Sequence, residues 1–207
     1  FDQAGSRIRY ILQRINTSIF RDPVQLMENI RRVTEHLSSK AGDSRSTLTL
    51  VSALDGKTWF RDADGSYWRV YLFIEHAKSY DVLRTGEQAY EAARAFGRFQ
   101  ADLVDLPGRL VETIPDFHNT PKRIADLEEA VRADVCGRVK TAEPEIEFVL
   151  SRKGEAETLI RLNREGAIPE RITHNDTKLN NVLIDSVTGL GKCVIDLDTV
   201  MPGLVHY

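Results

Sequence analysis

The spacing of apolar and polar positions divides the chain into a strand-rich beginning and a mainly helical remainder. Residues 7–16 partly alternate and are rich in β-branched and aromatic side chains, which predicts a half-buried strand. Asp22-Pro23 then supplies an N-cap and a first-turn proline, the usual start of a helix. Apolar residues follow at helical spacing and predict an amphipathic helix of about four turns; they are Leu26, Ile30, Val33 and Leu37.

Between residues 47 and 74 the pattern changes to short apolar runs separated by turns. The runs cover residues 48–51, 58–60 and 67–74, and Asp-Gly pairs at 55–56 and 64–65 are typical turn formers. This part of the sequence predicts an antiparallel meander.

The remainder favours helices, followed by one small hairpin. Apolar stripes are predicted at residues 92–103, 124–131 and 146–162, the first formed by Ala92, Phe96, Phe99 and Leu103. Two strand signals, at 182–185 and 192–196, flank a Thr-Gly-Leu-Gly turn. We therefore expect an α+β protein, with a sheet lobe over residues 1–75 and a helical lobe over residues 76–207.

Composition and charge exclude several classes of partner. Hydrophobic residues make up 42% of the chain, and 28 basic against 31 acidic residues give a net charge of -3 with no basic face for nucleic acid. Cys136 and Cys193 have no metal-ligand spacing, which fits a reducing, cytoplasmic setting. No apolar run approaches the roughly 18 residues that a bilayer requires, so no membrane partner is expected.

A polar loop before the hairpin carries the strongest chemical signal. Residues 173–181 contain one leucine among eight polar side chains, and Asp196 follows Asn181 by fifteen residues at the exit of an apolar strand. Phosphoryl transfer needs a carboxylate to orient an acceptor hydroxyl and oxygen ligands to hold Mg²⁺ against nucleotide phosphates. Asp176 fits the first role, Asn181 and Asp196 the second, and His174 would support the loop.

Each of these residues taken alone is equally compatible with an ordinary turn, in which Asp176 or Asn181 caps backbone groups. The combination H-x-D-x-x-x-x-N, hairpin, Ile-Asp is much more specific and indicates a phosphotransferase. Asp198 is either an assistant to Asp196 or a hydrogen-bond acceptor at the end of the hairpin.

These motifs resemble the aminoglycoside phosphotransferase and choline kinase superfamily, which is related to protein kinases. Within it, the sequence is most similar to the N-acetylhexosamine 1-kinases. The segments that carry the resemblance are His-Asn-Asp-Thr-Lys-Leu-Asn-Asn-Val-Leu-Ile-Asp at 174–185, Cys-Val-Ile-Asp-Leu-Asp-Thr-Val-Met-Pro-Gly at 193–203, and the stretches at 10–16 and 112–123.

The resemblance implies a protein-kinase-like two-lobe fold that uses ATP and Mg²⁺ to phosphorylate the anomeric hydroxyl of an N-acetylhexosamine, giving a sugar 1-phosphate. Choline, homoserine or an aminoglycoside are alternative acceptors, although residues 75–170 are mixed in charge, whereas a polycation calls for an acidic site. A nucleotide-binding pseudokinase module is the alternative from another class. The oligomeric state is not predicted.

The resemblance also assigns roles around the nucleotide. Arg14 would contact the phosphates, and Glu28 or Glu35 would be its helix partner unless both are solvent-facing charges. Residues 72–76 would form the hinge between the lobes, where Phe73 and Glu75 would contact the adenine.

Acceptor recognition is assigned to Asp116 and His118, in a proline-bounded polar loop that a purely structural role would explain equally well. Two parts that the resemblance implies have no counterpart in the sequence. A glycine-rich hairpin over the phosphates should precede Arg14, but only 13 residues do, with Gly5 as their single glycine. Several helices should follow Asp196, but only 11 residues do. We therefore expect a kinase truncated at both ends, with exposed apolar surface and poor activity by itself.

Overall fold

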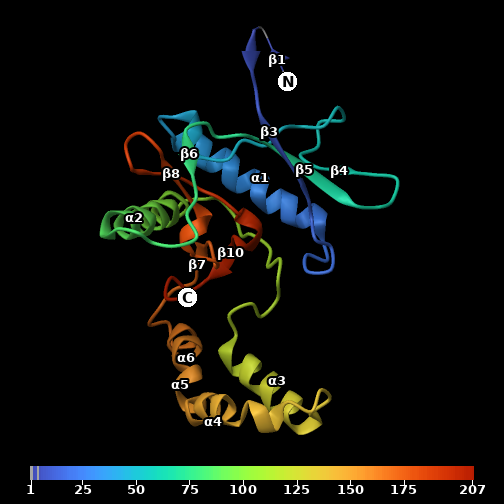
Figure 1. The fold of residues 1–207 in the computed structure, drawn as a ribbon, viewed down its shortest axis with the longest axis vertical. Helices are drawn as coiled ribbons and strands as arrows, with labels where there is room; N and C mark the ends of the chain where they lie inside the picture. The colour runs from blue at the N-terminus through green and yellow to red at the C-terminus, as the bar shows by residue number, and fades with distance from the viewer. Residues whose placement is uncertain (1, 4) are drawn as a thin grey trace. The chain divides into compact units, whose positions relative to one another are not determined.

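The computed structural model describes residues 2–3 and 5–207 (Figure 1). The chain forms two compact units, each described by itself. The first consists of Phe1–Ile114 and Ile172–Pro202, and the second of Pro115–Arg171 and Gly203–Tyr207.

An antiparallel sheet lies near the beginning of the first unit. Its strand order is β3 (Tyr10–Arg14), β5 (Tyr67–Leu72), β4 (Phe60–Arg61). The predicted strand over residues 7–16 is interrupted, because β1 (Asp2–Gln3) pairs with β2 (Ser6–Arg7) in a separate hairpin. Residues 48–51 form one isolated bridge, between Leu50 and Tyr71, instead of a full strand. Both predicted Asp-Gly turns are present, and their glycines adopt φ of +83° and +84°.

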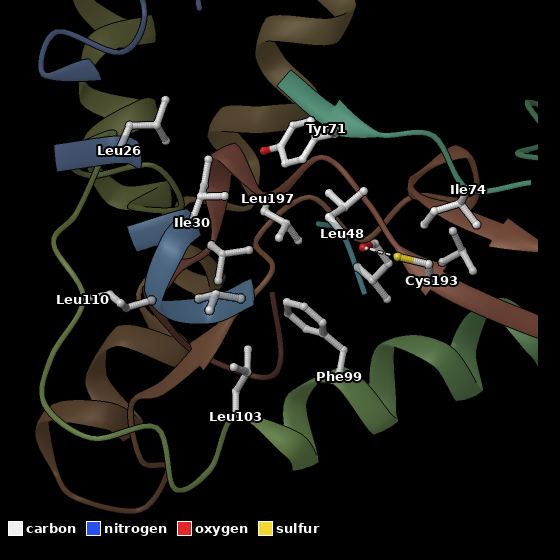
Figure 2. Packing of buried hydrophobic residues seen from close by; sticks show 14 of the residues in the cluster. Leu26, Ile30, Leu48, Tyr71, Ile74, Phe99, Leu103, Leu110, Cys193 and Leu197 are labelled. Carbon is white, nitrogen blue, oxygen red and sulfur yellow. Dashed lines mark hydrogen bonds between the residues drawn. The ribbon is translucent and has the colours of Figure 1, made fainter. Parts of the chain in front are cut away.

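Helix α1 (Pro23–Lys40) begins where the sequence predicts. The carboxylate of Asp22 accepts a hydrogen bond from the Gln25 N–H at 2.9 Å, which satisfies one of the free donors of the first turn. Leu26, Ile30 and Val33 are fully buried and share one core with Tyr71 of β5 (Figure 2). Each such side chain contributes roughly 1.5–3 kcal/mol through burial, so this stripe holds α1 to the sheet.

A second sheet in this unit contains β6 (Ala77–Lys78), β8 (Val182–Asp185) and β9 (Gly191–Val194), with β8 in the middle. Helix α2 (Gly86–Asp102), which carries the predicted stripe, packs against β9. A Cβ added at Gly191 would lie 2.7 Å from the carbonyl oxygen of Glu91, so only glycine allows this close approach. Two short strands, β7 (Arg171–Thr173) and β10 (Met201–Gly203), form a further pair.

Short 3₁₀ turns complete the unit; they are η1 (Ser44–Ser46), η3 (Leu179–Asn181) and η4 (Leu197–Thr199). The sheet face opposite α1 exposes apolar side chains, among them Leu12 at 64% and Phe60 at 59%. Within the described residues, no helix has the length and apolar character to cross a membrane.

The second unit is helical. It contains α3 (Thr120–Ala133), a 3₁₀ turn η2 (Val139–Thr141), α4 (Glu143–Ser151), α5 (Lys153–Ala156) and α6 (Thr158–Arg164). The predicted continuous stripe over residues 146–162 is therefore broken into three short helices. Gly154, a residue of low helix propensity, lies within the shortest of them, α5.

The division into units differs from the lobe boundary expected at Glu75. Strand β6, just after that boundary, pairs with β8, and the polar loop at residues 173–181 belongs to the same unit as the first sheet. The two-lobe organisation stays a prediction.

Candidate functional site

His174 lies at the centre of the polar loop and has no exposed surface. Its Nε2 is 2.9 Å from the carbonyl oxygen of Ile195, which can only accept, so Nε2 carries the proton. The Asp176 N–H donates to Nδ1 at 3.3 Å. Burial lowers the pKa of His174, and Phe96 and Phe99 contact the ring edge-on. His174 is therefore a neutral histidine that holds the polar loop to the exit of β9.

Asn175 fixes the loop from its other side. Its Nδ2 donates to the carbonyl oxygens of Thr173, Thr199 and Met201 at 3.2, 3.0 and 3.2 Å, and its Oδ1 accepts from the Thr173 hydroxyl at 2.7 Å. The residue is buried and adopts φ of +62°, a left-handed conformation that asparagine tolerates better than most residues. These bonds join the loop to the segment that follows Asp196.

The carboxylate of Asp176 faces two partners from its own loop. Lys178 Nζ lies 2.7 Å from Oδ2, and Asn181 Nδ2 donates to the same oxygen at 3.1 Å and to the Asp176 carbonyl at 2.9 Å. Burial acts to raise the pKa of Asp176, but the Lys178 ammonium and the Asn181 amide outweigh it, so the pKa is lowered. Asp176 is therefore an ionised, partly exposed carboxylate at neutral pH.

Asn181 and Asp196 come together because the hairpin register places their neighbours opposite each other. Val182 pairs with Val194, and the Ile195 N–H donates to the Asn181 carbonyl at 2.9 Å. Asp196 adopts a left-handed conformation with φ of 60° and ψ of 59°. Desolvation by the surrounding chain, followed by the charge of Asp198, raises the pKa of Asp196.

These two side chains fit the predicted role of holding Mg²⁺. Within the described part of the chain no hydrogen bond or ion pair engages the Asp196 carboxylate, and Asn181 uses its Nδ2 toward Asp176, which leaves Oδ1 to act as a ligand. No group of three or more His, Cys, Asp or Glu residues suited to a metal occurs among residues 2–3 and 5–207. Mg²⁺ commonly takes one or two protein oxygens together with water and phosphate, so a pair of ligands suffices.

Asp198, the second carboxylate at the exit of the hairpin, is engaged in an ion pair. Arg69, on the central strand β5, forms an ion pair with both oxygens of Asp198. Of the two roles that the sequence leaves open for Asp198, this contact corresponds to the hydrogen-bond acceptor.

The predicted pairing of Arg14 with a helix glutamate is not formed. Glu28 accepts from Arg31 Nε and Nη2 at 2.9 and 2.7 Å, and Glu35 pairs with Arg31 Nη1 at 2.6 Å. Their spacing of three and four residues places all three on the same side of α1, nearer to each other than to β3. In the ladder Arg14 pairs with Trp68, so it lies on the sheet face opposite Arg69. Its contact with phosphates stays a prediction.

The predicted hinge is held by contacts of its own. The Phe73 N–H donates to the Arg9 carbonyl at 3.0 Å, the Arg9 guanidinium lies 3.8 Å from the Phe73 ring centroid, and Arg9 pairs with Glu75. His76 adopts φ of +58°, and its carbonyl accepts from the Ser186 N–H at 2.7 Å. The segment is therefore bonded to the β8–β9 hairpin, and its contact with adenine stays a prediction.

Asp116 and His118 belong to the second unit. Asp116 adopts φ of +58° and its Oδ1 accepts from Asn119 Nδ2 at 2.9 Å, in the turn that caps α3. His118 lies between the rings of Phe117 and Tyr207, with centroids 4.7 and 4.8 Å away. Their acceptor-binding role stays a prediction.

Three residues of the first unit were not singled out by sequence reasoning, although the structure places them at the site. Lys178 is a cation two residues after Asp176, and that proximity could have indicated it. Asn175 reads as an ordinary loop residue until its three carbonyl partners are known. Arg69 is separated from Asp198 by 129 positions, so no local pattern could connect them.

Comparisons with known proteins bear on the family and on the fold. A family model described as the phosphotransferase enzyme family, APH, matches residues 1–207. The solved structure of an aminoglycoside phosphotransferase from Alicyclobacillus acidocaldarius is similar, with a TM-score of 0.50 and 15% identity, over 95% of this chain and 58% of that one.

The AMP-bound complex of spectinomycin phosphotransferase APH(9)-Ia has a TM-score of 0.49 and 13% identity, over 94% of this chain and 60% of that one. This chain therefore spans less than two thirds of the length of both proteins. At 15% identity the first likeness bears on the fold alone. Because the family match extends along the whole sequence, the chain belongs to the phosphotransferase enzyme family.

Proposed function

We propose that this protein is an ATP-dependent kinase that phosphorylates a hydroxyl group of a small molecule. The observation that carries the proposal is the arrangement of Asp176, Asn181 and Asp196. Asn181 contacts Asp176 directly, and its carbonyl is bonded to the residue before Asp196. A carboxylate for the acceptor and two oxygen ligands for a cation thus meet in one small region, as phosphoryl transfer requires.

Asp176 would orient the acceptor hydroxyl by accepting its hydrogen bond. Since its pKa is lowered, it is ionised at neutral pH but is a weak base, so it would take the proton only as the new bond to phosphorus forms. Lys178, beside Asp176 and half exposed, would face the negative charge of the transferred group. Its pKa is raised, chiefly through its bond to Asp176, so it keeps its positive charge.

Asn181 and Asp196 would hold the Mg²⁺ ion. When bound, Mg²⁺ neutralises charge on the nucleotide phosphate oxygens. For the nucleotide itself, we propose that residues 72–76 contact the adenine through Phe73 and Glu75, and that Arg14 contacts the phosphates. The contacts that hold the hinge support the first assignment. The side chain of Arg14 lies on the sheet face opposite Arg69, so the second assignment rests on the sequence resemblance alone.

As acceptor we propose an N-acetylhexosamine, phosphorylated at its anomeric hydroxyl, with Asp116 and His118 contributing to recognition. The motif at residues 174–185 and the Pro-Asp-Phe-His segment, which resemble the N-acetylhexosamine 1-kinases, support this choice. Mixed charge over residues 75–170 counts against a polycationic acceptor.

The test follows ATP consumption by the protein with Mg²⁺ and a panel of acceptors: N-acetylglucosamine, N-acetylgalactosamine, choline, homoserine and kanamycin. Asp176→Asn should reduce turnover by about 10²–10⁴-fold. Asp185→Asn is the matched control, because Asp185 accepts from the N–H groups of Val187 and Thr188 and an amide oxygen can do the same.

Turnover confined to the N-acetylhexosamines and lost in Asp176→Asn supports the full proposal. Another preferred acceptor would refute the sugar assignment alone. Nucleotide binding without turnover for any acceptor would refute the kinase and leave a nucleotide-binding module.

A further inference from the structure

Arg69 is a buried cation beside the proposed metal site. Its side chain is 6% exposed, and that of Asp198 is 16% exposed. Nη1 and Nη2 each bind one oxygen of the Asp198 carboxylate, the second at 3.0 Å. Such a forked pair fixes direction as well as distance, which a single ammonium cannot do. Both oxygens of Asp198 therefore have a partner other than a metal.

The sheet holds the Arg69 guanidinium in this orientation. Its Nε donates to Gln13 Oε1 at 3.0 Å, and the register pairs Gln13 with Arg69 on the same face. The guanidinium carbon lies 5.3 Å from the ring centroid of Tyr71, a buried residue two positions along β5. The arginine is thus fixed by two strands and forms a rigid anchor point.

The anchored residue belongs to the turn that presents Asp196. Thr113 donates its hydroxyl to the Asp198 carbonyl at 2.9 Å, so Asp198 is held at both its carboxylate and its backbone. On the other side of Asp196, the Ile195 N–H is bonded to the Asn181 carbonyl. A left-handed aspartate persists when its surroundings determine its backbone from both sides, and here they do.

We propose that Arg69 is a positioning residue for divalent-cation binding, which acts through Asp198 to fix the orientation of Asp196. Asp198 is then an anchor for the turn and does not bind the cation. This inference rests on the proposed metal role of Asn181 and Asp196. The role it gives to Arg69 of β5 differs from the phosphate contact that the sequence resemblance implies for Arg14 of β3.

The test measures Mn²⁺ binding in the presence of ADP, by the electron paramagnetic resonance signal of free Mn²⁺. Arg69→Gln and Asp198→Asn should each weaken Mn²⁺ binding by about 10–100-fold, the usual effect of removing a residue that orients a metal ligand. Arg69→Lys, which keeps the charge but loses the fork, should fall between them and the wild type. Combining Arg69→Gln with Asp198→Asn should add little to either change alone.

Lys192→Gln is the control, because it removes another ion pair of the same unit, formed by the largely buried Lys192 with the more exposed Asp43, outside the turn. It should leave Mn²⁺ affinity unchanged. If the Arg69 variants lose thermal stability but bind Mn²⁺ as tightly as wild type, the contact is structural and the inference is wrong. If Asp198→Asn weakens Mn²⁺ binding far more than Arg69→Gln, Asp198 is itself a ligand, and the inference is again wrong.

Asp196→Asn separates this inference from the function on which it rests. If wild type and Asp196→Asn bind Mn²⁺ equally weakly, the proposed metal site fails, and the role of Arg69 fails with it. If Asp196→Asn lowers affinity and Arg69→Gln does not, the metal site stands and the role of Arg69 alone is refuted.

Discussion

Replacing Asn175 by aspartate tests whether the hydrogen bonds of the Asn175 side chain stabilise the polar loop and with it the folded protein. The substitution preserves the size and shape of the side chain but converts a donor group into an acceptor. In the native structure that group, Nδ2, faces three carbonyl oxygens between 3.0 and 3.2 Å away. In the variant a carboxylate oxygen would face the same three acceptors.

The magnitude follows from the bonds that are lost. Each buried hydrogen bond contributes about 0.5–1.5 kcal/mol, and an unpaired buried polar group costs about 1–3 kcal/mol. Three lost bonds, with partial relaxation of the loop, predict a decrease in unfolding free energy of about 3–5 kcal/mol. The carboxyl group relieves part of this loss by taking up a proton, which restores one donor, so the destabilisation should diminish as pH falls toward 4–5.

Urea unfolding of wild type and variant at pH 7.5 and pH 5 measures both effects. Asn16→Asp is the control, because the exposed Asn16 side chain accepts one backbone N–H, from Ser18 at 3.1 Å, and a carboxylate accepts it equally well. If the unfolding free energy of Asn175→Asp at pH 7.5 lies within about 0.5 kcal/mol of the wild-type value, the hydrogen bonds of Asn175 do not stabilise the loop.

Two further predictions concern packing and pH. Gly191→Ala should lower the unfolding free energy by about 1–3 kcal/mol, because the added Cβ would collide with the carbonyl oxygen of Glu91. Gly97→Ala is the control: Gly97 lies in the same helix as Glu91 with no atoms near its added Cβ, so the change should raise the unfolding free energy by about 1 kcal/mol. Equal effects of the two changes in thermal denaturation would refute the close approach at Gly191. The pKa of His174 is lowered in the folded state, so the unfolded chain binds its proton first as pH falls below about 6.5. Its contribution to stability should therefore be complete above that pH and decline below it, by up to about 1.4 kcal/mol per pH unit, and this slope should be absent in His174→Gln.

Features encoded by neighbouring residues could be predicted from the sequence. The Asp22-Pro23 start of α1 and its apolar stripe, the Asp-Gly turns and the hairpin after Asn181 all depend on side chains a few positions apart. The H-x-D-x-x-x-x-N motif and Asp196 could be recognised for the same reason, because they occupy eight loop positions and one strand exit; their catalytic role stays a prediction.

Features that depend on register or on distant partners could not be predicted. The alternation along β3 decides which face Arg14 occupies, and a shift of one residue reverses it. The pairing of Glu28 and Glu35 with Arg31 is an exception, because its spacings of three and four residues could have been recognised in the sequence. Arg69 and Asp198 meet through the folding of β5 against η4, which no spacing rule contains.

The central position of β8 determines how firmly the polar loop at residues 173–181 is tethered. β8 is paired on one edge with β6, directly after the hinge, and on the other with β9. Each amide of β8 that bonds to a neighbouring strand exchanges only when that strand opens, and amides on both edges are covered, so β8 should be among the slowest-exchanging parts of this sheet. Since Asn181 immediately precedes β8, the loop is tethered to a segment that stays closed during local fluctuations.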